Sequence, residues 1–341
     1  YLSSEITPFA KVGGLADVAN SLPRYLKENE HDIRVLMPKY KMIRDRKYNL
    51  REVIRLRDII VPLGKEVITV SVKSGFIPDS KVQAYFLEYK PFFDRPDIYV
   101  DPRNGKGWVD DHLRFALFAK AAFEMLKVLY WQPDLIHVND WPGALVPFYL
   151  KTVYRNEPFF EHIKTMLTVH NMAYQGEFSP EILPDIASDG LPFDETHPAW
   201  HNGSFNFLKA GLKTADMVTA VSPTYAKEII EDDQVGCGLG PVCADLADRF
   251  VGILNGIDSD IWNPETDEYL PAKYSLEDFE GKAENRQVLR ETLDLDCDDD
   301  TMIIGMISRL VYQKGFDLLV AAIDKIMTGN VAFVIPVSYT H

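Results

Sequence analysis

The sequence predicts an α/β protein in which helices cover the faces of a mainly parallel sheet. Short runs rich in Val, Ile and Leu alternate with longer helical patterns along the chain, which is typical of strands joined by helical crossovers. Polar clusters follow several of the predicted strands, at the edge where open parallel sheets bind ligands. The pattern restarts near residue 301. We therefore expect one complete domain of this kind and the opening strand, helix and strand of a second.

The predicted elements of the first half follow one another closely. In order, they are the tail of a strand at 1–4, a helix from 15, a strand at 31–38, a β pair at 67–72 and 82–87, and a long helix at 111–130. The last of these is predicted to be amphipathic, because Leu113, Leu117 and Ala121 recur on one stripe.

Short buried strands dominate the second half. They are predicted at 135–138, 166–169, 217–221 and 250–254, and again at 302–307 and 331–335 around a helix at 314–327. A stretch at 263–284 rich in Pro, Asp, Glu and Tyr reads as a linker. We therefore expect an N-terminal Rossmann-like domain at 1–255, a linker region at 256–300 and the start of a second Rossmann-like domain at 301–341.

The composition excludes several classes of protein. With 46% hydrophobic and 26% charged residues the chain is typical of a globular protein, and no run approaches the roughly 20 apolar residues of a membrane span. Lys+Arg 36 against Asp+Glu 51 gives a net charge of −15, whereas phosphate-backbone binding needs a basic surface. We expect neither nucleic acid nor membrane as a partner.

Metal and cofactor sites have no support in the sequence. Cys237, Cys243 and Cys297 are too few and too irregularly spaced for a disulfide framework or a zinc site. No cluster of carboxylates suits Mg²⁺, so we expect no metal and no cofactor. Such cysteine usage fits a reducing compartment, and we expect a cytoplasmic location.

A glycine-containing loop precedes the first helix and is suited to an anion. Gly13 and Gly14 allow the backbone to approach a ligand, the helix start directs free N–H groups toward it, and Lys11 adds a full positive charge. This arrangement predicts a phosphate or diphosphate site. The alternative is an ordinary strand–turn–helix connection with a solvated lysine.

Four further polar clusters follow predicted strands. They are His137–Trp141, Thr168–Asn171, Asn255–Asp258 and Ser308-Arg309. Because strand ends of a parallel sheet meet at one edge, the five clusters together predict a ligand site there.

Each cluster also has a plain structural interpretation. His137 is expected to bond backbone near the sheet edge, and Asp140 is equally suited to cap the helix that follows it. His170 and Asn171 suit a polyhydroxyl ligand, although Asn171 also suits a turn. Asn255 followed by glycine reads as a turn as well.

Two cations near the last predicted helix suggest a second anion contact. Arg309 and Lys314 lie close together in the sequence, just before a helix start at Gly315, which favours a diphosphate. A solvated surface pair is the alternative. No motif of a serine hydrolase, a zinc protease or a P-loop NTPase is present.

Taken together, the motifs resemble those of bacterial glycogen synthases and plant starch synthases, glycosyltransferase family 5. They occur in the family's order and cover almost the whole chain. The motifs are Ser3-Ser4-Glu5 with Lys11–Leu15, His137–Trp141, Thr168–Gly176, Phe207–Gly211, Ala215-Asp216, Val221–Ala226, Gly252–Asp258 with Trp262–Pro264, Ser308–Leu310 and Gln313–Gly315.

The resemblance implies a GT-B fold, two Rossmann-like domains facing each other across a cleft. It implies transfer of glucose from ADP-glucose, less often UDP-glucose, to the non-reducing end of an α-1,4-glucan with retention of configuration. Preorganised cations and helix dipoles would stabilise the departing ADP. The resemblance implies catalytic roles for Asp140, His170, Arg309 and Lys314, and substrate-binding roles for Lys11, Gly13, Gly14, Asn171 and Asn255.

Two departures from the family pattern stand out. The family's second domain continues with an active-site glutamate and the residues that hold adenine and ribose, whereas this chain ends at His341. We expect that the last few residues are not native and that the fragment alone has little or no transferase activity. Cys237 also stands where the family commonly has an aromatic residue. Tyr1 is not a start methionine, so a targeting peptide, for example to a plastid, would lie upstream.

Two other functions remain open. One is a different retaining GT-B enzyme, such as a sucrose- or trehalose-type synthase or a phosphorylase; the Lys11 loop and the run Trp262–Pro264 argue against it. The other is a non-catalytic glucan-binding protein, against which the retention of Lys11, Arg309 and Lys314 argues. The donor preference and the oligomeric state cannot be read from the sequence.

Overall fold

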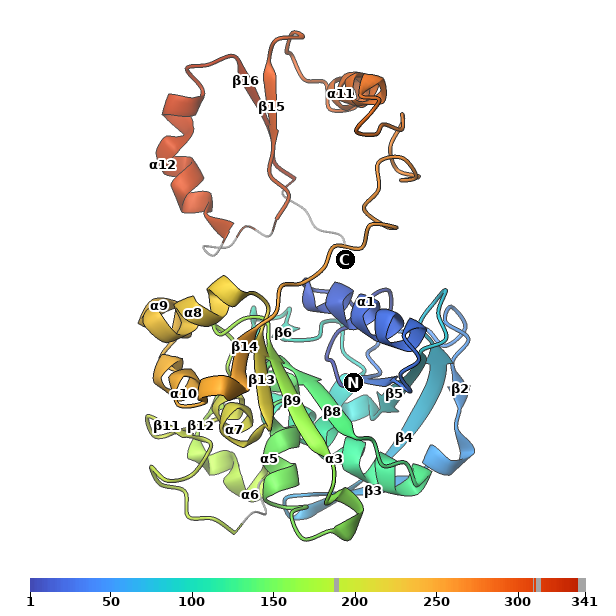
Figure 1. The fold of residues 1–341 in the computed structure, drawn as a ribbon, viewed down its shortest axis with the longest axis vertical. Coiled ribbons are helices and arrows are strands. Elements are labelled where there is room, and N and C mark those ends of the chain that lie inside the picture. The colour runs from blue at the N-terminus through green and yellow to red at the C-terminus, as the bar shows by residue number, and fades with distance from the viewer. Residues whose placement is uncertain (187–189, 309, 311–313, 337–341) are drawn as a thin grey trace. The chain divides into compact units, whose positions relative to one another are not determined.

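The chain forms two compact units, residues 1–256 (unit 1) and 257–341 (unit 2). The structure is a computed structural model that describes residues 1–186, 190–308, 310 and 314–336. In Figure 1 unit 1 runs from blue to light orange, and unit 2 is orange to red. Residues 257–300, which fall in the predicted linker region, belong to unit 2.

Unit 1 is built on one twisted sheet with a parallel half and a mixed half. The parallel half has the strand order β14-β13-β9-β8, and the mixed half has the order β1-β5-β4-β2 with β3 paired to β4. The strands are β1 (Arg34–Pro38), β2 (Arg51–Glu52), β3 (Ile59–Leu63), β4 (Glu66–Phe76), β5 (Gln83–Glu88), β8 (Leu135–Asn139), β9 (Lys164–Val169), β13 (Met217–Ala220) and β14 (Phe250–Gly252). The α/β class and the predicted strands of this unit are confirmed, whereas β2 and β3 were not predicted.

Leu2 joins the two halves of the sheet. It forms parallel bridges to Leu36 of β1 on one side and to Val138 of β8 on the other. Its amide donates to the His137 carbonyl at 2.8 Å, and the Ser3 amide donates to the Leu36 carbonyl at 3.1 Å. The predicted strand tail at the start of the chain is therefore the central strand position of the sheet.

Helices and short turns connect these strands (Figure 1). They are α1 (Leu15–Glu28), α2 (Lys90–Phe93), α3 (Asp111–Leu129), α4 (Asp140–Gly143), α5 (Leu145–Lys151), α6 (Leu183–Ile186), α7 (Phe207–Thr214), α8 (Pro223–Glu231), α9 (Asp233–Gly236) and α10 (Gly240–Ala244), with single 3₁₀ turns at Ile54–Leu56, Pro158–Phe160, Pro180–Ile182 and Ala247–Arg249. Small β ribbons are formed by β6 (Val100–Asp101) with β7 (Lys106–Gly107), and by β10 (Glu177–Phe178), β12 (Ser204–Asn206) and β11 (Trp200–His201).

The long helix α3 differs from its prediction in one respect. It spans the predicted residues, but its side chains from Arg114 to Phe123 are buried all round the helix rather than along one stripe. Phe115 and Phe118 are both fully buried. A helix that is buried on all sides lies inside the core of a domain.

Unit 2 contains a parallel β pair and two helices. The strands β15 (Met302–Gly305) and β16 (Val331–Val334) pair in parallel, with α12 (Phe316–Ile326) between them in the sequence. This confirms the predicted strand–helix–strand order. An additional helix, α11 (Glu280–Thr292), was not predicted.

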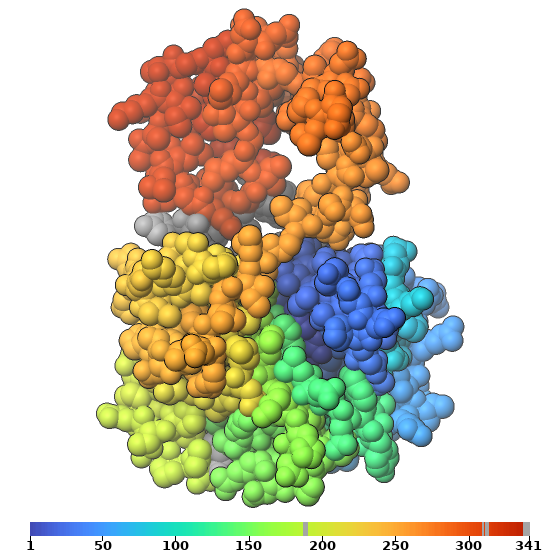
Figure 2. Space-filling model, viewed as in Figure 1, coloured from blue at the N-terminus to red at the C-terminus, as the bar shows by residue number. Residues whose placement is uncertain are grey.

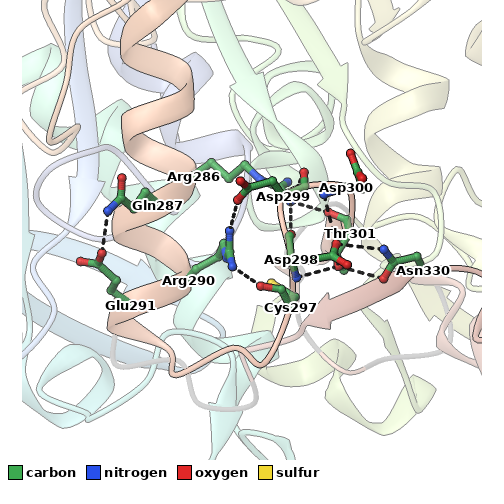
Figure 3. Close-up of polar contacts among 10 residues, drawn as sticks. All are labelled: Arg286, Gln287, Arg290, Glu291, Cys297, Asp298, Asp299, Asp300, Thr301 and Asn330. Carbon is green, nitrogen blue, oxygen red and sulfur yellow. Dashed lines mark hydrogen bonds and ion pairs between the residues drawn. The ribbon is translucent and has the colours of Figure 1, made fainter.

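Polar contacts attach α11 to the loop before β15 (Figure 3). Arg286 donates to the Thr301 carbonyl at 2.5 Å, and Arg290 pairs with Asp299 at 2.6 Å. Asp298 in turn accepts from Asn330 at the start of β16 at 3.0 Å. Unit 2 therefore relies on polar contacts where unit 1 relies on apolar packing.

Within the described residues, no helix is long and apolar enough to cross a membrane.

Candidate functional site

The carboxyl ends of the four parallel strands β8, β9, β13 and β14 lie level with one another. Asn139 of β8 is opposite Thr168 of β9, while Val169 is opposite Ala220 of β13, which is opposite Gly252 of β14. Residues that follow these strands therefore leave the sheet at one edge, as the sequence predicts. This edge carries the candidate site of unit 1.

Asp140 connects the ends of β8 and β9. Its Oδ1 accepts hydrogen bonds from the backbone amides of His170 at 2.7 Å and Asn171 at 3.4 Å. It does not cap α4, because Asn139 occupies the N-cap position and no side chain makes a capping hydrogen bond there. Asp140 also has a φ of 49°, in the left-handed region that few non-glycine residues adopt and in which aspartate is enriched.

Burial raises the pKa of Asp140 above its usual range. The hydrogen bonds from the two amides and the proximity of His170 act in the opposite direction, and the charge of Glu5 raises the pKa further. The influence of Glu5 indicates that the first loop of the chain lies near this strand end.

The ring of His170 is oriented by a buried asparagine. Its Nε2 lies 3.0 Å from Asn139 Oδ1, which also accepts from the Tyr1 hydroxyl at 3.0 Å, while Asn139 Nδ2 donates to the Leu2 carbonyl at 2.9 Å. Because this oxygen only accepts, Nε2 must carry the proton. In the neutral ring Nδ1 is then the acceptor, which suits a ligand hydroxyl.

Asn171 and Asn255 are less closely bound into the site. Asn171 Oδ1 accepts from the Ala173 amide at 3.0 Å, which is the turn geometry that the sequence allows as an alternative. Asn255 is exposed and follows β14 in an irregular segment rather than in a turn.

Several groups of the glycine loop that could bind an anion already pair with other residues of unit 1. Lys11 Nζ lies 2.8 Å from both carboxylate oxygens of Asp17. The amides of Val12 and Gly13 donate to Glu5 Oε2 at 2.5 and 2.9 Å. A Cβ added at Gly13 or Gly14 would meet no atom within 4 Å, so the space beside both glycines is open.

His137 is structural, as predicted, but its partner is a side chain. Its Nε2 lies 2.7 Å from Thr168 Oγ1, which lies 2.7 Å from Thr219 Oγ1 in the next strand. Burial lowers the pKa of His137 to about 3, so the ring is neutral. This polar chain runs across the sheet from β8 through β9 to β13.

A cavity of about 610 Å³ opens beside the strand-end cluster. It combines aromatic faces with hydrogen-bonding groups, which is typical of a small-molecule or sugar site. Its lining residues include Asp111, Trp141, Tyr174, Gln175, Glu177, Phe178, His201 and Cys237.

The walls of this cavity are fixed by direct contacts. Gly176 has a φ of 63°, and a Cβ added to it would overlap the Trp141 ring, so only glycine allows the two to approach. Asn206 Nδ2 donates to Gln175 Oε1 at 2.7 Å and to Glu177 Oε1 at 3.0 Å. No pattern in the sequence points to Glu177 or His201, although the run Thr168–Gly176 leads directly into the cavity.

Of the two cations predicted in unit 2, the structure describes Lys314. Lys314 is exposed and directly precedes Gly315, the N-cap residue of α12, whose φ of 72° is in the left-handed region. Arg309 lies outside the described residues. Among the residues that the structure describes, no group of three His, Cys, Asp or Glu side chains could hold a metal ion.

Comparison with known proteins gives one consistent result. Residues 1–245 match the family model of the starch synthase catalytic domain. The chain is 40% identical to glycogen synthase 1 of Geobacter metallireducens over 97% of its own length and 65% of that protein. It is 38% identical to the glycogen synthase of Thermotoga maritima over 98% of its own length and 68% of that protein.

A solved structure has the same fold. The catalytic domain of starch synthase IV from Arabidopsis thaliana, bound to ADP and acarbose, superposes with a TM-score of 0.86 at 30% identity, covering 98% of this chain and 67% of that one. This likeness confirms the predicted GT-B fold class. The chain spans about two thirds of the length of these relatives. It belongs to the glycogen and starch synthase family, whose starch synthase catalytic domain makes up most of unit 1.

Proposed function

We propose that this chain belongs to a glycogen or starch synthase that transfers glucose from ADP-glucose to the non-reducing end of an α-1,4-glucan with retention of configuration. The observation that carries the proposal is the cluster in which Asp140 holds the amides of His170 and Asn171 beside the 610 Å³ cavity. The similar Arabidopsis enzyme domain, solved with ADP and acarbose, supports a nucleotide and a glucan-like ligand as the two substrates.

The sugar side of the reaction is assigned to the strand-end cluster. We assign the donor glucose to the surroundings of Asp140, His170 and Asn255, with Asn171 at the same strand exit. His170 Nδ1 would accept a glucose hydroxyl, because Nε2 already donates to Asn139. Asp140 would hold the backbone in its left-handed conformation, so that the site is organised before the sugar arrives.

The acceptor glucan is assigned to the cavity. Trp141 and Phe178 would supply apolar faces for sugar rings, and Glu177 and His201 would bind hydroxyl groups.

The leaving-group side is assigned to cations and helix N-termini. Departure of ADP places negative charge on the diphosphate, and fixed cations and N–H groups stabilise such charge in the transition state. We assign this role to Lys11, Gly13 and Gly14 at the start of α1, and to Arg309 and Lys314 before α12. Lys11 would have to exchange its partner Asp17 for the ligand.

Ligand binding tests the proposal on this chain. Isothermal titration with maltoheptaose and with ADP-glucose should show binding of both. His170→Ala should weaken ADP-glucose binding by about tenfold, the loss of one good polar contact, and leave maltoheptaose binding within about twofold, because His170 does not line the cavity. His162→Ala is the matched control, because His162 is exposed and distant in the sequence from the predicted motifs. Binding of neither ligand contradicts the proposal.

A non-catalytic glucan-binding protein is the second candidate. The engagement of Lys11 by Asp17 and of the Gly13 amide by Glu5 favours it, since both groups are then occupied without a diphosphate. Such a protein should bind maltoheptaose but not ADP-glucose in the same titration.

The proposed reaction also suggests where the protein works. We propose a cytoplasmic location, supported by the similarity to bacterial glycogen synthases and by the cysteine usage, to be tested by fractionation of the native host.

A further inference from the structure

We propose that Glu5 is a positioning residue that holds the glycine loop, residues 11–14, in the conformation that receives the anionic leaving group. The inference rests on the proposed function and adds a residue to which no role has been assigned. Glu5 itself does not touch the substrate; it acts through the backbone of Val12 and Gly13.

The carboxylate of Glu5 is buried and fully used by hydrogen-bond donors. It is only 4% exposed. Oε2 accepts from the amides of Val12 at 2.5 Å and Gly13 at 2.9 Å, and Oε1 accepts from the Tyr99 hydroxyl at 2.7 Å. In the described part of the chain no cationic side chain pairs with it. A buried carboxylate without a cation is costly unless several N–H or O–H groups donate to it, so these three contacts must form together.

Hydrogen bonds hold both Glu5 and its partner Tyr99 in place. The Ser3 hydroxyl donates to the Glu5 carbonyl at 2.6 Å, and the Ser3 amide donates to the Leu36 carbonyl of β1, which ties Glu5 to the sheet. On the other side the Tyr99 hydroxyl lies 2.6 Å from the Ser4 hydroxyl. Burial raises the pKa of Tyr99 well above its usual range, so the phenol keeps the proton that it donates to Glu5.

This arrangement determines which amides remain for a ligand. The amides of Val12 and Gly13 are occupied by Glu5, whereas those of Gly14 and Leu15 donate to no oxygen among the described residues. These two groups begin α1, where the helix dipole favours an anion. In the proposed function the amides of Gly14 and Leu15 would therefore donate to the anion, while Gly13 would contribute the open space beside it.

The test compares Glu5→Ala with Glu5→Gln. In Glu5→Ala the loop loses the single oxygen that accepts from both amides, and the amides of Val12 and Gly13 should exchange hydrogen at least about tenfold faster. In Glu5→Gln one oxygen can still accept from both amides, while the side-chain NH₂ donates to Tyr99 and Tyr99 donates to Ser4. Exchange should then stay close to that of the unaltered chain. Glu28→Ala, at an exposed position at the end of α1, is the matched control.

Ligand binding separates a positioning role from a merely structural one. Glu5→Ala should weaken ADP-glucose binding by about tenfold and leave maltoheptaose binding within about twofold, because only the diphosphate depends on the loop. Equal weakening of both ligands, or unchanged binding of ADP-glucose, overturns the proposal. Should Glu5→Ala fail to fold, Glu5→Met replaces it, because the longer side chain fills more of the vacated space but likewise cannot accept from the amides of Val12 and Gly13.

Failure of the proposed function gives a different result. An unaltered chain that binds neither ligand contradicts the synthase assignment, and hydrogen exchange then decides on Glu5 alone. Faster exchange confined to residues 11–14 supports the positioning role, and unchanged exchange in Glu5→Ala refutes it.

Discussion

At the scale of single residues, the acceptors of the first loop and of the strand ends explain the local conformations. Glu5 and Asp140 are both carboxylates that accept from two backbone amides of another segment. Each fixes a turn at the candidate site without a metal or a cation pair in the described residues. Side chains of this kind are hard to identify in a sequence, because nothing in the neighbouring residues shows which amides they will meet.

His137 predicts how stability depends on pH. Burial lowers its pKa from 6.5 to about 3, so the unfolded chain binds a proton that the folded chain does not. With respect to this group, the free energy of unfolding is highest above pH 6.5. It falls as the pH drops toward 3, by up to about 1.4 kcal/mol per pH unit. Urea unfolding from pH 7 to pH 4 should therefore show a smaller loss of stability in His137→Gln than in the unaltered chain.

Exposed His162 provides the control for this measurement. His162→Gln should leave the pH dependence unchanged, because the His162 side chain is exposed to solvent. A pH dependence that is identical in His137→Gln and the unaltered chain would show that His137 is not buried as a neutral ring.

At the scale of elements, the sequence predicted the parallel strands, but it did not predict how deeply α3 is buried or that α11 forms. Runs of Val, Ile and Leu identify the parallel strands, and the geometry of parallel sheets brings their ends together, which is why Asp140, His170 and Asn171 meet as expected. The burial of α3 on all sides could not be inferred, since it depends on β3, α5 and the 3₁₀ turn at Ile54–Leu56, which come from other parts of the chain. Helix α11 was missed because it has little apolar character and is held by Arg286 and Arg290.

Gly176, in the loop after β9, and Gly203 should differ in how much stability the chain loses when each is replaced by alanine. Gly176 and Gly203 both have positive φ angles, but only at Gly176 would a Cβ overlap another side chain, that of Trp141. Gly203→Ala should cost about 1 kcal/mol of unfolding free energy from backbone strain alone. Gly176→Ala should cost about 3 kcal/mol, because Trp141 must also move.

Urea unfolding of the two variants, together with maltoheptaose titration, checks this difference. Only Gly176→Ala should also weaken the glucan ligand, because Trp141 lines the cavity. Equal stability losses in the two variants would mean that Trp141 does not pack against Gly176.

At the scale of the whole molecule, the apolar core belongs to unit 1. All apolar residues that are buried among the described residues lie between Tyr1 and Phe250, whereas Leu318 and Val320 of α12 are largely exposed. A polypeptide of residues 1–256 should therefore fold alone. Its main melting transition should lie within about 2 °C of that of the full chain, which corresponds to less than about 1 kcal/mol.

Calorimetry of the two polypeptides makes this comparison directly. A clearly lower melting temperature for residues 1–256 would show that unit 2 contributes to the stability of the core. Figure 2 shows the blue N-terminal residues on the surface of unit 1, and the proposed anion-binding start of α1 lies within residues 1–256.

The position of Leu2 has a consequence for biosynthesis. The strand pairs that Leu2 makes reach forward to β1 and, much further along the chain, to β8. During translation these first residues leave the ribosome long before β8 has been made, and they remain a single unpaired edge until then. The halves of the sheet can close only when residue 139 has emerged, so the strand-end cluster of Asp140 and His170 cannot form before that point of synthesis.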